Sequence, residues 1–279
     1  MKFLPIFLAI ATAGTLAAAP QRGTAPKKPA TPPRAAAPAP KTPAAPAAPL
    51  VDASVPFQVG ETLTYDASWS SFLTAGQVKL RVADRQALGA GHSGYHLVAE
   101  AQTVSLAAKM YQVYYKVESV IDTASLAAVR ASTYSNERGR ERVKSFWFGA
   151  KNIGSYEIKR GDVSKGQVQL PPRTLDPLGA MYIARALKAN PGETLVIPIV
   201  DGDTVSRLRL TFGNRETVKT GQGTSNGWRV TATLTDLQGK SQSARPLLIW
   251  LSDDAQRRPL RFEGALAVGS VTLALAKVP

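Results

Sequence analysis

From residue 55 onward, hydrophobic and polar residues alternate along most of the chain with a period of two. The alternation is clearest in four segments, ETLTYDASWS (61–70), QVKLRV (77–82), RLRLTF (207–212) and GWRVTATLTDL (227–237). Such alternation is typical of strands in a sheet that has one buried face and one solvent-exposed face. Glycine-rich turn signals separate these runs at hairpin spacing. The pattern therefore predicts a mainly β, antiparallel protein with a dozen or more strands.

One segment, LDPLGAMYIARALKANPG, departs from this period and predicts a central helix at about 176–189. Asp176 is a suitable N-cap, Pro177 suits the first helical position, and Asn190-Pro191-Gly192 ends the helix. Apolar side chains surround much of its circumference, so we expect the helix to pack firmly onto a sheet or to plug its open end. Its Met, Tyr and Leu residues are expected in the core, with the lining of an apolar pocket as the alternative.

Two short similarities within the chain raise the question of internal duplication. VGETLTY, which begins at residue 59, is similar to PGETLVI, which begins at residue 191. VIDTASLAAVRAS, from residue 120, is likewise similar to WLSDDAQRRPLRFE, from residue 250. We therefore expect a single β-rich domain at 55–279, and its division into two repeated halves, 55–175 and 190–279, stays open.

The first 54 residues have a different composition from the rest. Residues 1–19 carry one lysine, an apolar run and then small residues, which is the layout of a secretory signal peptide. The apolar run is short for a membrane-spanning helix, although an uncleaved anchor is the alternative. Residues 20–54 consist mostly of Ala, Pro and Lys, a composition that favours an extended, disordered linker. Its basic segment 20–50 is a solvated spacer or a tether to an anionic wall or membrane surface.

The amino-acid composition excludes several kinds of functional site. The chain contains no cysteine, which excludes disulfides, thiolate metal sites, cysteine nucleophiles and a lipoprotein anchor on cysteine. The formal net charge of +14 suggests anionic surroundings. Because the leader predicts a periplasmic or otherwise exported location, we do not expect nucleic acid as a partner.

One segment, LLIWLSDDAQRRPLRFEG (247–264), concentrates carboxylate, guanidinium and hydroxyl side chains, and its pattern predicts a hairpin corner. Serine and aspartate side chains stabilise turns by bonding to nearby backbone N–H groups. A nucleophilic Ser252 would need a base, usually histidine, and the chain has only His92 and His96. These two lie in a GAGHSGYHL context that predicts a loop entering a strand, with exposed side chains that bind no metal. The sequence thus supplies no catalytic residue, no metal ligand and no cofactor site.

Four segments in this order, GETLTYDASW, YYKVESVIDTASLAAVR, LPPRTLDPLGAMYIARAL and LLIWLSDDAQRRPLRFEGALAVGSVTLAL, resemble exported bacterial proteins of the domain of unknown function 3108 family. The hairpin in the last segment also looks like one in LolA-like lipoprotein carriers, which are half-open β-barrels that hold acyl chains. The resemblances imply strongly bent antiparallel sheets or half-open barrels. They supply no catalytic residues.

Three functions remain open on this basis. The first is a non-enzymatic envelope protein that binds a lipid or another apolar or amphiphilic ligand in the concavity of a bent sheet. The second is an envelope scaffold or interaction protein with a basic tether, and the third is a hydrolase with an unrecognised site. For the first, we expect an apolar lining formed by Trp69, Tyr115, Trp147, Tyr182, Trp228 and Trp250.

Overall fold

The computed structural model describes residues 53–69, 73–187, 189–242, 245–265 and 270–278. The first eight strands are β1 (Thr62–Trp69), β2 (Leu73–Gly89), β3 (His92–Thr103), β4 (Val113–Asp122), β5 (Ala128–Glu137), β6 (Arg140–Phe148), β7 (Ile153–Arg160) and β8 (Asp162–Gln169). The remaining strands are β9 (Thr194–Asp201), β10 (Thr204–Thr220), β11 (Gly223–Thr235), β12 (Leu247–Ser252), β13 (Pro259–Ala265) and β14 (Ser270–Lys277). The helices are α1 (Ser105–Met110), α2 (Pro177–Ala186) and the short 3₁₀ turn η1 (Ala150–Asn152).

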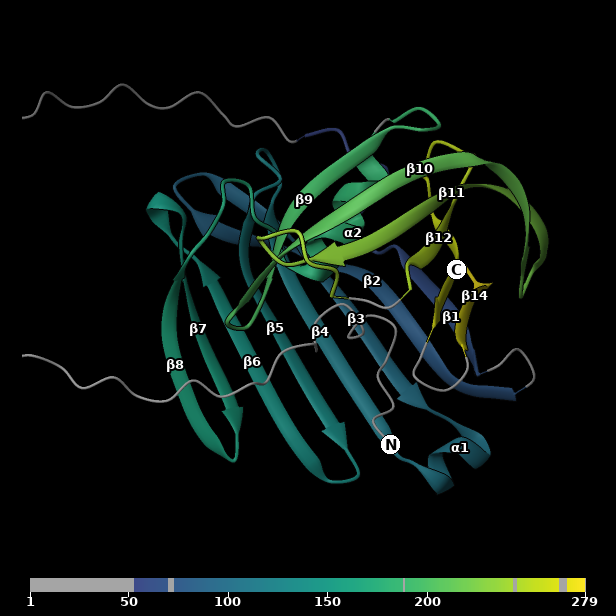
Figure 1. Ribbon diagram of the computed structural model, residues 1–279, viewed down its shortest axis with the longest axis horizontal. Helices are drawn as coiled ribbons and strands as arrows, with labels where there is room; N and C mark the ends of the chain where they lie inside the picture. Colours follow the sequence, from purple (N-terminus) through teal and green to yellow (C-terminus); the bar gives the residue numbers. More distant parts are fainter. Residues whose placement is uncertain (1–52, 70–72, 188, 243–244, 266–269, 279) are drawn as a thin grey trace, which may run out of the picture.

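All fourteen strands belong to one antiparallel sheet. Strands that are neighbours in the sheet are also consecutive in the chain, except where β1 pairs with β14. The order is β8-β7-β6-β5-β4-β3-β2-β1-β14-β13-β12-β11-β10-β9, so the first strand pairs with the last in the middle of the sheet. The two edge strands, β8 and β9, are consecutive in the chain and are joined by the segment that contains α2. The sheet curves strongly but does not close (Figure 1). The predicted bent, half-open antiparallel architecture is confirmed.

Helix α2 lies inside the curve of the sheet, where it contacts β3, β4 and β9, while β9, β10 and β11 arch over it (Figure 1). Asp176 caps its first turn as predicted, accepting hydrogen bonds from the N–H groups of Leu178 (3.0 Å) and Gly179 (2.9 Å). The helix ends at Ala186, slightly earlier than expected, because Leu187 already has an extended backbone ahead of the turn at Pro191. The prediction of one central, firmly packed helix is confirmed.

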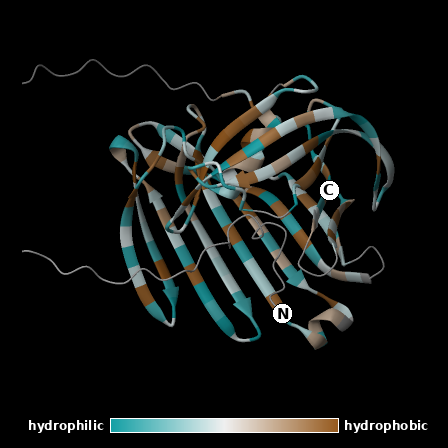
Figure 2. Ribbon diagram, in the orientation of Figure 1, coloured by the Kyte–Doolittle hydropathy of each residue, from teal (hydrophilic) through white to brown (hydrophobic). Residues whose placement is uncertain are grey.

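The main core lies between α2 and the inner face of the sheet. Hydrophobic and hydrophilic residues alternate along the strands (Figure 2), and the hydrophobic set turns inward. Leu63, Leu80 and Tyr182 are fully buried there. Phe57 packs edge-on against both Tyr95 and Tyr182, with ring centroids 5.4 and 5.1 Å apart. The space around α2 is therefore densely filled with side chains.

The long hairpin β10–β11 folds back over the outer face of the sheet, where β10 contacts β13 and β14. The N–H of Gly221 donates to the carbonyl of Leu275 (2.9 Å). A Cβ at Gly221 would lie 2.9 Å from the Cα of Ala276, so this close approach requires glycine. Val218 of the hairpin and Trp250 of β12 are buried at this contact and belong to the same hydrophobic cluster as Leu63 and Leu80.

The described residues test the other sequence predictions only in part. The predicted signal peptide (1–19) and residues 20–52 of the predicted linker lie outside the described residues. Ala53 donates its N–H to the carbonyl of Thr123 (2.7 Å). Helix α1, between β3 and β4, has no counterpart in the sequence prediction. In the described ranges, neither α-helix has the length and hydrophobicity of a membrane-spanning helix. The division into repeated halves stays a prediction.

Candidate ligand-binding concavity

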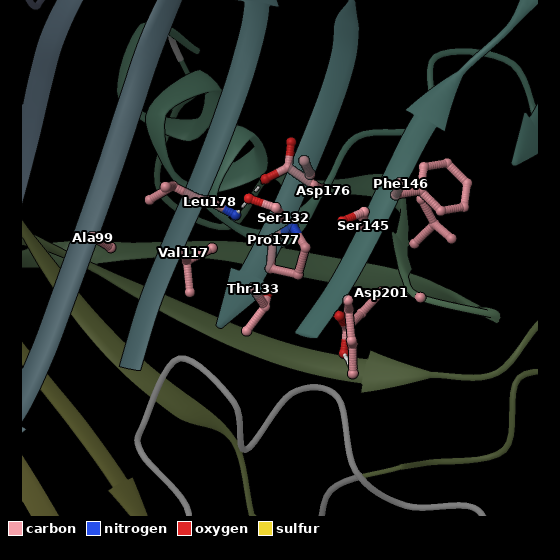
Figure 3. A pocket seen from close by; sticks show the side chains of 14 residues that line it. Ala99, Val117, Ser132, Thr133, Ser145, Phe146, Asp176, Pro177, Leu178 and Asp201 are labelled. Carbon is pink, nitrogen blue, oxygen red and sulfur yellow. Dashed lines mark hydrogen bonds and ion pairs between the residues drawn. The ribbon is translucent and has the colours of Figure 1, made fainter. Parts of the chain in front are cut away.

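A pocket lies on the inner face of the sheet, where the part filled by α2 meets the part that α2 leaves uncovered (Figure 3). Its floor comes from β3 to β6 and its roof from the start of α2 and the β9–β10 turn. The lining residues are Ala99, Val117, Ala131, Ser132, Thr133, Lys144, Ser145, Phe146, Asp176, Pro177, Leu178, Val200, Asp201 and Gly202. The cavity volume is about 30 Å³, which is room for one or two water molecules.

The carboxylate of Asp176 is buried in the roof of this pocket. The Ser119 hydroxyl of β4 donates to its Oδ2 (2.6 Å), in addition to the two capping bonds from α2. Burial raises the pKa of Asp176, and the hydrogen bonds from Ser119 and the helix only partly counteract that effect. A Cβ at Gly179 would lie 2.8 Å from Oδ2 of Asp176, so glycine lets the helix sit this close to β4. Asp176 is thus a structural clamp between helix and sheet.

Lys144 of β6 forms an ion pair with Asp201 at the β9–β10 turn. The two side chains are 13% and 12% exposed, so solvent screens this pair only weakly. The pair connects the two sides of the unclosed sheet. The small hydrophobic cluster of Phe146, Leu170 and Val200 reinforces the contact.

Beyond the pocket, the inner face of the sheet continues along the ends of β5–β8, which extend away from α2 (Figure 1). Thr133 and Ile158 on this face are half-buried. Arg142, two residues before Lys144 in the chain, lies on the same inner face of β6. Burial lowers the pKa of Arg142, and the nearby positive charge of Arg160 lowers it further. Apolar and small side chains near the pocket therefore give way to the positive charges of Arg142 and Arg160 towards these strand ends, with Glu137 and Asp201 as the nearby carboxylates.

The structure does not bring the six predicted lining residues together, since none of them lines this pocket. Tyr182 is buried in α2, and Tyr115 is buried in β4 with its hydroxyl bonded to Glu137. Trp69 is half-buried at the end of β1. Trp147 is 47% exposed on the outer face of β6.

The other two tryptophans lie on opposite faces of the C-terminal strands. Trp250 is buried on the outer face under the β10–β11 hairpin, with its indole N–H bonded to Glu216 (3.0 Å). Trp228 lines a separate cavity. Whether any of the six contacts a ligand stays a prediction.

Two larger cavities flank the Ser252–Arg258 corner between β12 and β13. One, of about 380 Å³, is lined by residues of segments 55–62 and 255–258 together with Val278. Beside it, the fully buried Arg185 of α2 pairs with Glu61 (2.6 Å) and donates to the carbonyl of Gln256 (3.0 Å). The other cavity, of about 270 Å³, includes Trp228 and Arg257.

The Ser252–Arg258 segment is a hairpin corner, as the sequence predicted. Oδ1 of Asp254 accepts hydrogen bonds from the Ser252 hydroxyl (2.8 Å) and from the N–H groups of Gln256 (2.9 Å) and Arg257 (3.0 Å). The Ser252 oxygen in turn accepts the N–H of Arg258 (2.8 Å). The Ser252 hydroxyl therefore both donates and accepts within the turn and stabilises the corner.

Neither histidine is part of a nucleophile–base–acid arrangement. Both lie in β3, so His92 is not in a loop as expected, although its side chain is exposed. His92 bonds to Asp122 (2.7 Å), but the nearby Ser125 hydroxyl donates to Asp122 as well. A triad would need a hydroxyl on the histidine.

His96 is not exposed as expected; its side chain is 17% exposed, because it lies between Asp84 and Glu118, with 3.2 Å to each carboxylate. Carboxylates thus occupy both of its ring nitrogens. In the described part of the chain, no three His, Asp or Glu side chains are grouped to hold a metal ion.

Comparison with known proteins places the chain in a family. The family model described as "Protein of unknown function (DUF3108)" matches residues 64–276. The chain belongs to this family. No curated protein matches the sequence. The resemblance inferred from the four sequence segments is confirmed.

Two solved structures are similar to this DUF3108 protein to different degrees. A β-barrel-like protein of the DUF1849 family from Brucella abortus has 10% sequence identity and a TM-score of 0.51, with 79% of this chain and 97% of that chain covered. A protein from Bacteroides fragilis described as exported and YmcC-like has 12% identity and a TM-score of 0.31, covering 82% and 100%. The first of these supports the barrel-like fold, and at this level of identity it carries no statement about activity.

Sequence reasoning missed the groups that define the cavities. Asp176 was predicted only as a helix cap, and Arg185 was not singled out. An arginine inside an otherwise apolar helix segment was the available signal, because a fully buried arginine needs an ionic partner. The partner, Glu61, lies 124 residues away, so no local pattern could identify it.

Proposed function

We propose that this DUF3108 protein is a non-enzymatic cell-envelope protein that binds an apolar or amphiphilic ligand on the inner face of β4–β7. One observation supports the proposal above the others: the sheet curves around α2, whose main strand contacts are with β3, β4 and β9, and the strands β5–β7 extend past the helix. Past the helix, the β9–β10 turn covers the near part of the inner face of β5 and β6, while Thr133 and Ile158 stay half-buried. A concave, partly apolar sheet face of this kind suits a ligand.

The side chains on this face suggest how such a ligand would lie. Val117, Ala131 and Ile158 offer an apolar surface near α2, while Arg142 and Arg160 offer positive charge towards the strand ends. An amphiphile would place its apolar part against the former and an anionic group near the latter. Ligand sites typically measure about 300–1,000 Å³, so entry into the pocket itself requires the β9–β10 turn to move away from β6.

The proposed location is the periplasm or another extracytoplasmic compartment. The apolar, cysteine-free leader at 1–19 supports it. An anionic wall or membrane surface is the proposed partner of the basic segment 20–50. A lipid or another envelope amphiphile is the proposed ligand.

Native mass spectrometry of the protein, purified gently from its own cell envelope, tests the ligand. We expect a bound species of discrete excess mass. Thr133→Phe, which fills the floor of the pocket, should remove that mass. Ser155→Phe is the matched control, because Ser155 lies opposite Trp147 on the outer face of the same sheet. A ligand-free mass in several gentle preparations, or equal loss from both variants, would contradict the proposal.

A second candidate function is an envelope scaffold, and the exposed Trp147 favours it. This indole lies on the outer face of β6, paired with Arg130 of β5. Exposed aromatic residues beside arginine are common at interfaces. Co-sedimentation of the full chain with purified cell wall or anionic vesicles, lost in Trp147→Ser but retained in Thr133→Phe, would support the scaffold in place of the ligand carrier.

A further inference from the structure

The 270 Å³ cavity lies at the opposite end of α2 from the pocket at Asp176. It is lined by Ala189, Asn190, Pro191, Phe212, Trp228 and Arg257. The first three residues follow the C-terminal end of α2, whereas Asp176 precedes its first turn. The helix therefore separates this cavity from the pocket at Asp176 and from the inner face of β4–β7.

Hydrogen bonds hold the two aromatic walls of the cavity in place. Phe212 donates its N–H to the carbonyl of Glu193 (2.9 Å) and accepts the N–H of Gly192 (2.7 Å). The indole N–H of Trp228 donates to Asp253 (2.6 Å). Because these bonds exist without a ligand, the aromatic surface is already formed, and binding would not have to order it.

Arg257 supplies a positive charge to the same cavity. Its guanidinium Nε and Nη2 are buried and have no hydrogen-bond acceptor among the described residues. Burial lowers the pKa of Arg257, with no neighbouring carboxylate to counteract the effect. The remaining nitrogen, Nη1, is not among the buried atoms, so it is the donor that an incoming group can reach.

The nearby carboxylates are engaged elsewhere. Asp253 pairs with Arg215 (2.5 Å). Asp254 accepts the backbone N–H of Arg257 within the turn, together with the other turn donors. Glu193 is bonded to the side chain and backbone of Asn190 (2.9 Å each). The protein therefore leaves the Arg257 charge uncompensated.

An uncompensated, partly buried charge is unfavourable, and an anion that pairs with it gains a charge-assisted hydrogen bond. We propose that this cavity binds a small organic anion whose carboxylate or phosphate pairs with Arg257 and whose apolar body contacts Trp228 and Phe212. An inorganic ion would leave most of the cavity and both aromatic walls unused. The site is independent of the ligand proposed for the inner face of β4–β7.

Calorimetric titration of the full chain tests this site with four probes: hexanoate, hexyl phosphate, acetate and hexan-1-ol. We expect both six-carbon anions to bind more tightly than acetate, which lacks the apolar body, and than hexan-1-ol, which lacks the charge. Arg257→Gln should weaken anion binding by about tenfold to a hundredfold, the loss typical of a hydrogen bond to a charged group. The relative affinities of hexanoate and hexyl phosphate identify the preferred anion.

The control variants separate this site from other effects. Arg209→Gln removes the same charge from an exposed position on β10 and should leave the affinity unchanged. Thr133→Phe, at the other site, should also leave it unchanged. The proposal is wrong if neither anion binds, if hexan-1-ol binds as well as hexanoate, or if the Arg257 and Arg209 variants behave alike. Thermal melting followed by circular dichroism checks that each variant is folded.

Discussion

The sheet has two parts that follow the same alternation but differ in what covers their inner face. Around α2, inward side chains such as Leu63 and Leu80 are fully buried. On the ends of β5–β8 that extend past the helix, inward side chains such as Thr133 and Ile158 are only half-buried. The comparison teaches that alternation fixes which side chains share a face, whereas the covering element decides whether that face becomes core.

The inward residues differ in the way this rule requires. Opposite α2 they are large and apolar, while along the uncovered strand ends they include Thr133 and Arg142, which are half-buried. Charged side chains are tolerated there because they remain near solvent. Four predictions test how far the two parts differ.

The largest difference is expected for ion pairs. Glu61→Gln leaves the fully buried Arg185 without its carboxylate, which should lower the free energy of unfolding by about 3–5 kcal/mol. Glu157→Gln breaks the exposed Glu157–Lys165 pair on the uncovered part, and this should cost about 0–1 kcal/mol. Denaturant unfolding measures both. Equal losses would show that the Glu157–Lys165 pair is as strongly shielded from solvent as the buried Arg185–Glu61 pair.

Aliphatic truncation should give the next largest difference. Leu80→Ala removes a fully buried side chain and should cost about 2–5 kcal/mol. Ile158→Ala removes a half-buried one and should cost about 1 kcal/mol. Comparison of the two denaturant midpoints at constant slope checks the prediction. A loss for Ile158→Ala as large as that for Leu80→Ala would mean that the concavity is filled, which would also contradict the proposed ligand face.

The pH dependence of stability should differ between two carboxylates. Burial raises the pKa of Asp176, so its contribution to the free energy of unfolding is full below the unfolded-state pKa, about 3.9, and is lost as pH rises through the raised folded-state value. Denaturant unfolding from pH 4 upward should therefore show wild type losing stability relative to Asp176→Asn.

Asp122 is the control with the opposite sign. Burial alone would raise its pKa, but hydrogen bonds from Ser125, His92 and Ala124 lower it overall. Its stabilising contribution should be present above the unfolded-state pKa and lost as pH falls through the folded-state value. If wild type and Asp176→Asn show parallel pH profiles, the buried carboxylate does not titrate in this window.

The smallest effect is expected on the outer face of the uncovered part. Trp147→Ser removes a side chain that is 47% exposed, so the free energy of unfolding should change by no more than about 0.5 kcal/mol. Thermal melting of the two proteins measures it. A large loss would mean that the Trp147 side chain is packed in solution and not exposed as in the structure.

Local signals in the sequence predicted much of the fold. The Asp176-Pro177 start of α2 and the Ser252–Asp254 corner were both predicted correctly, because capping and turn bonds connect residues close in sequence. The strands followed from alternation alone. Helix α1 was missed because a helix of six residues shows too little of its period to be distinguished from a loop.

Contacts between distant segments could not be predicted in the same way. Trp250 alternates correctly within its strand, yet the face it occupies is buried only because the β10–β11 hairpin folds back over β12–β14. The six aromatic residues expected to share a cavity are instead distributed over both faces of the sheet. The Arg185–Glu61 pair and the unpaired guanidinium of Arg257 likewise depend on how distant segments meet.

The pairing of β1 with β14 affects the order in which the molecule folds. Trp69 lies opposite Val271, so the two runs of consecutive hairpins are joined by a strand pair whose members are about two hundred residues apart in the chain. Contacts of such long sequence separation form slowly. Pairing of β1 with β14 is therefore expected to be a late step in folding, after the two runs of neighbouring hairpins have formed.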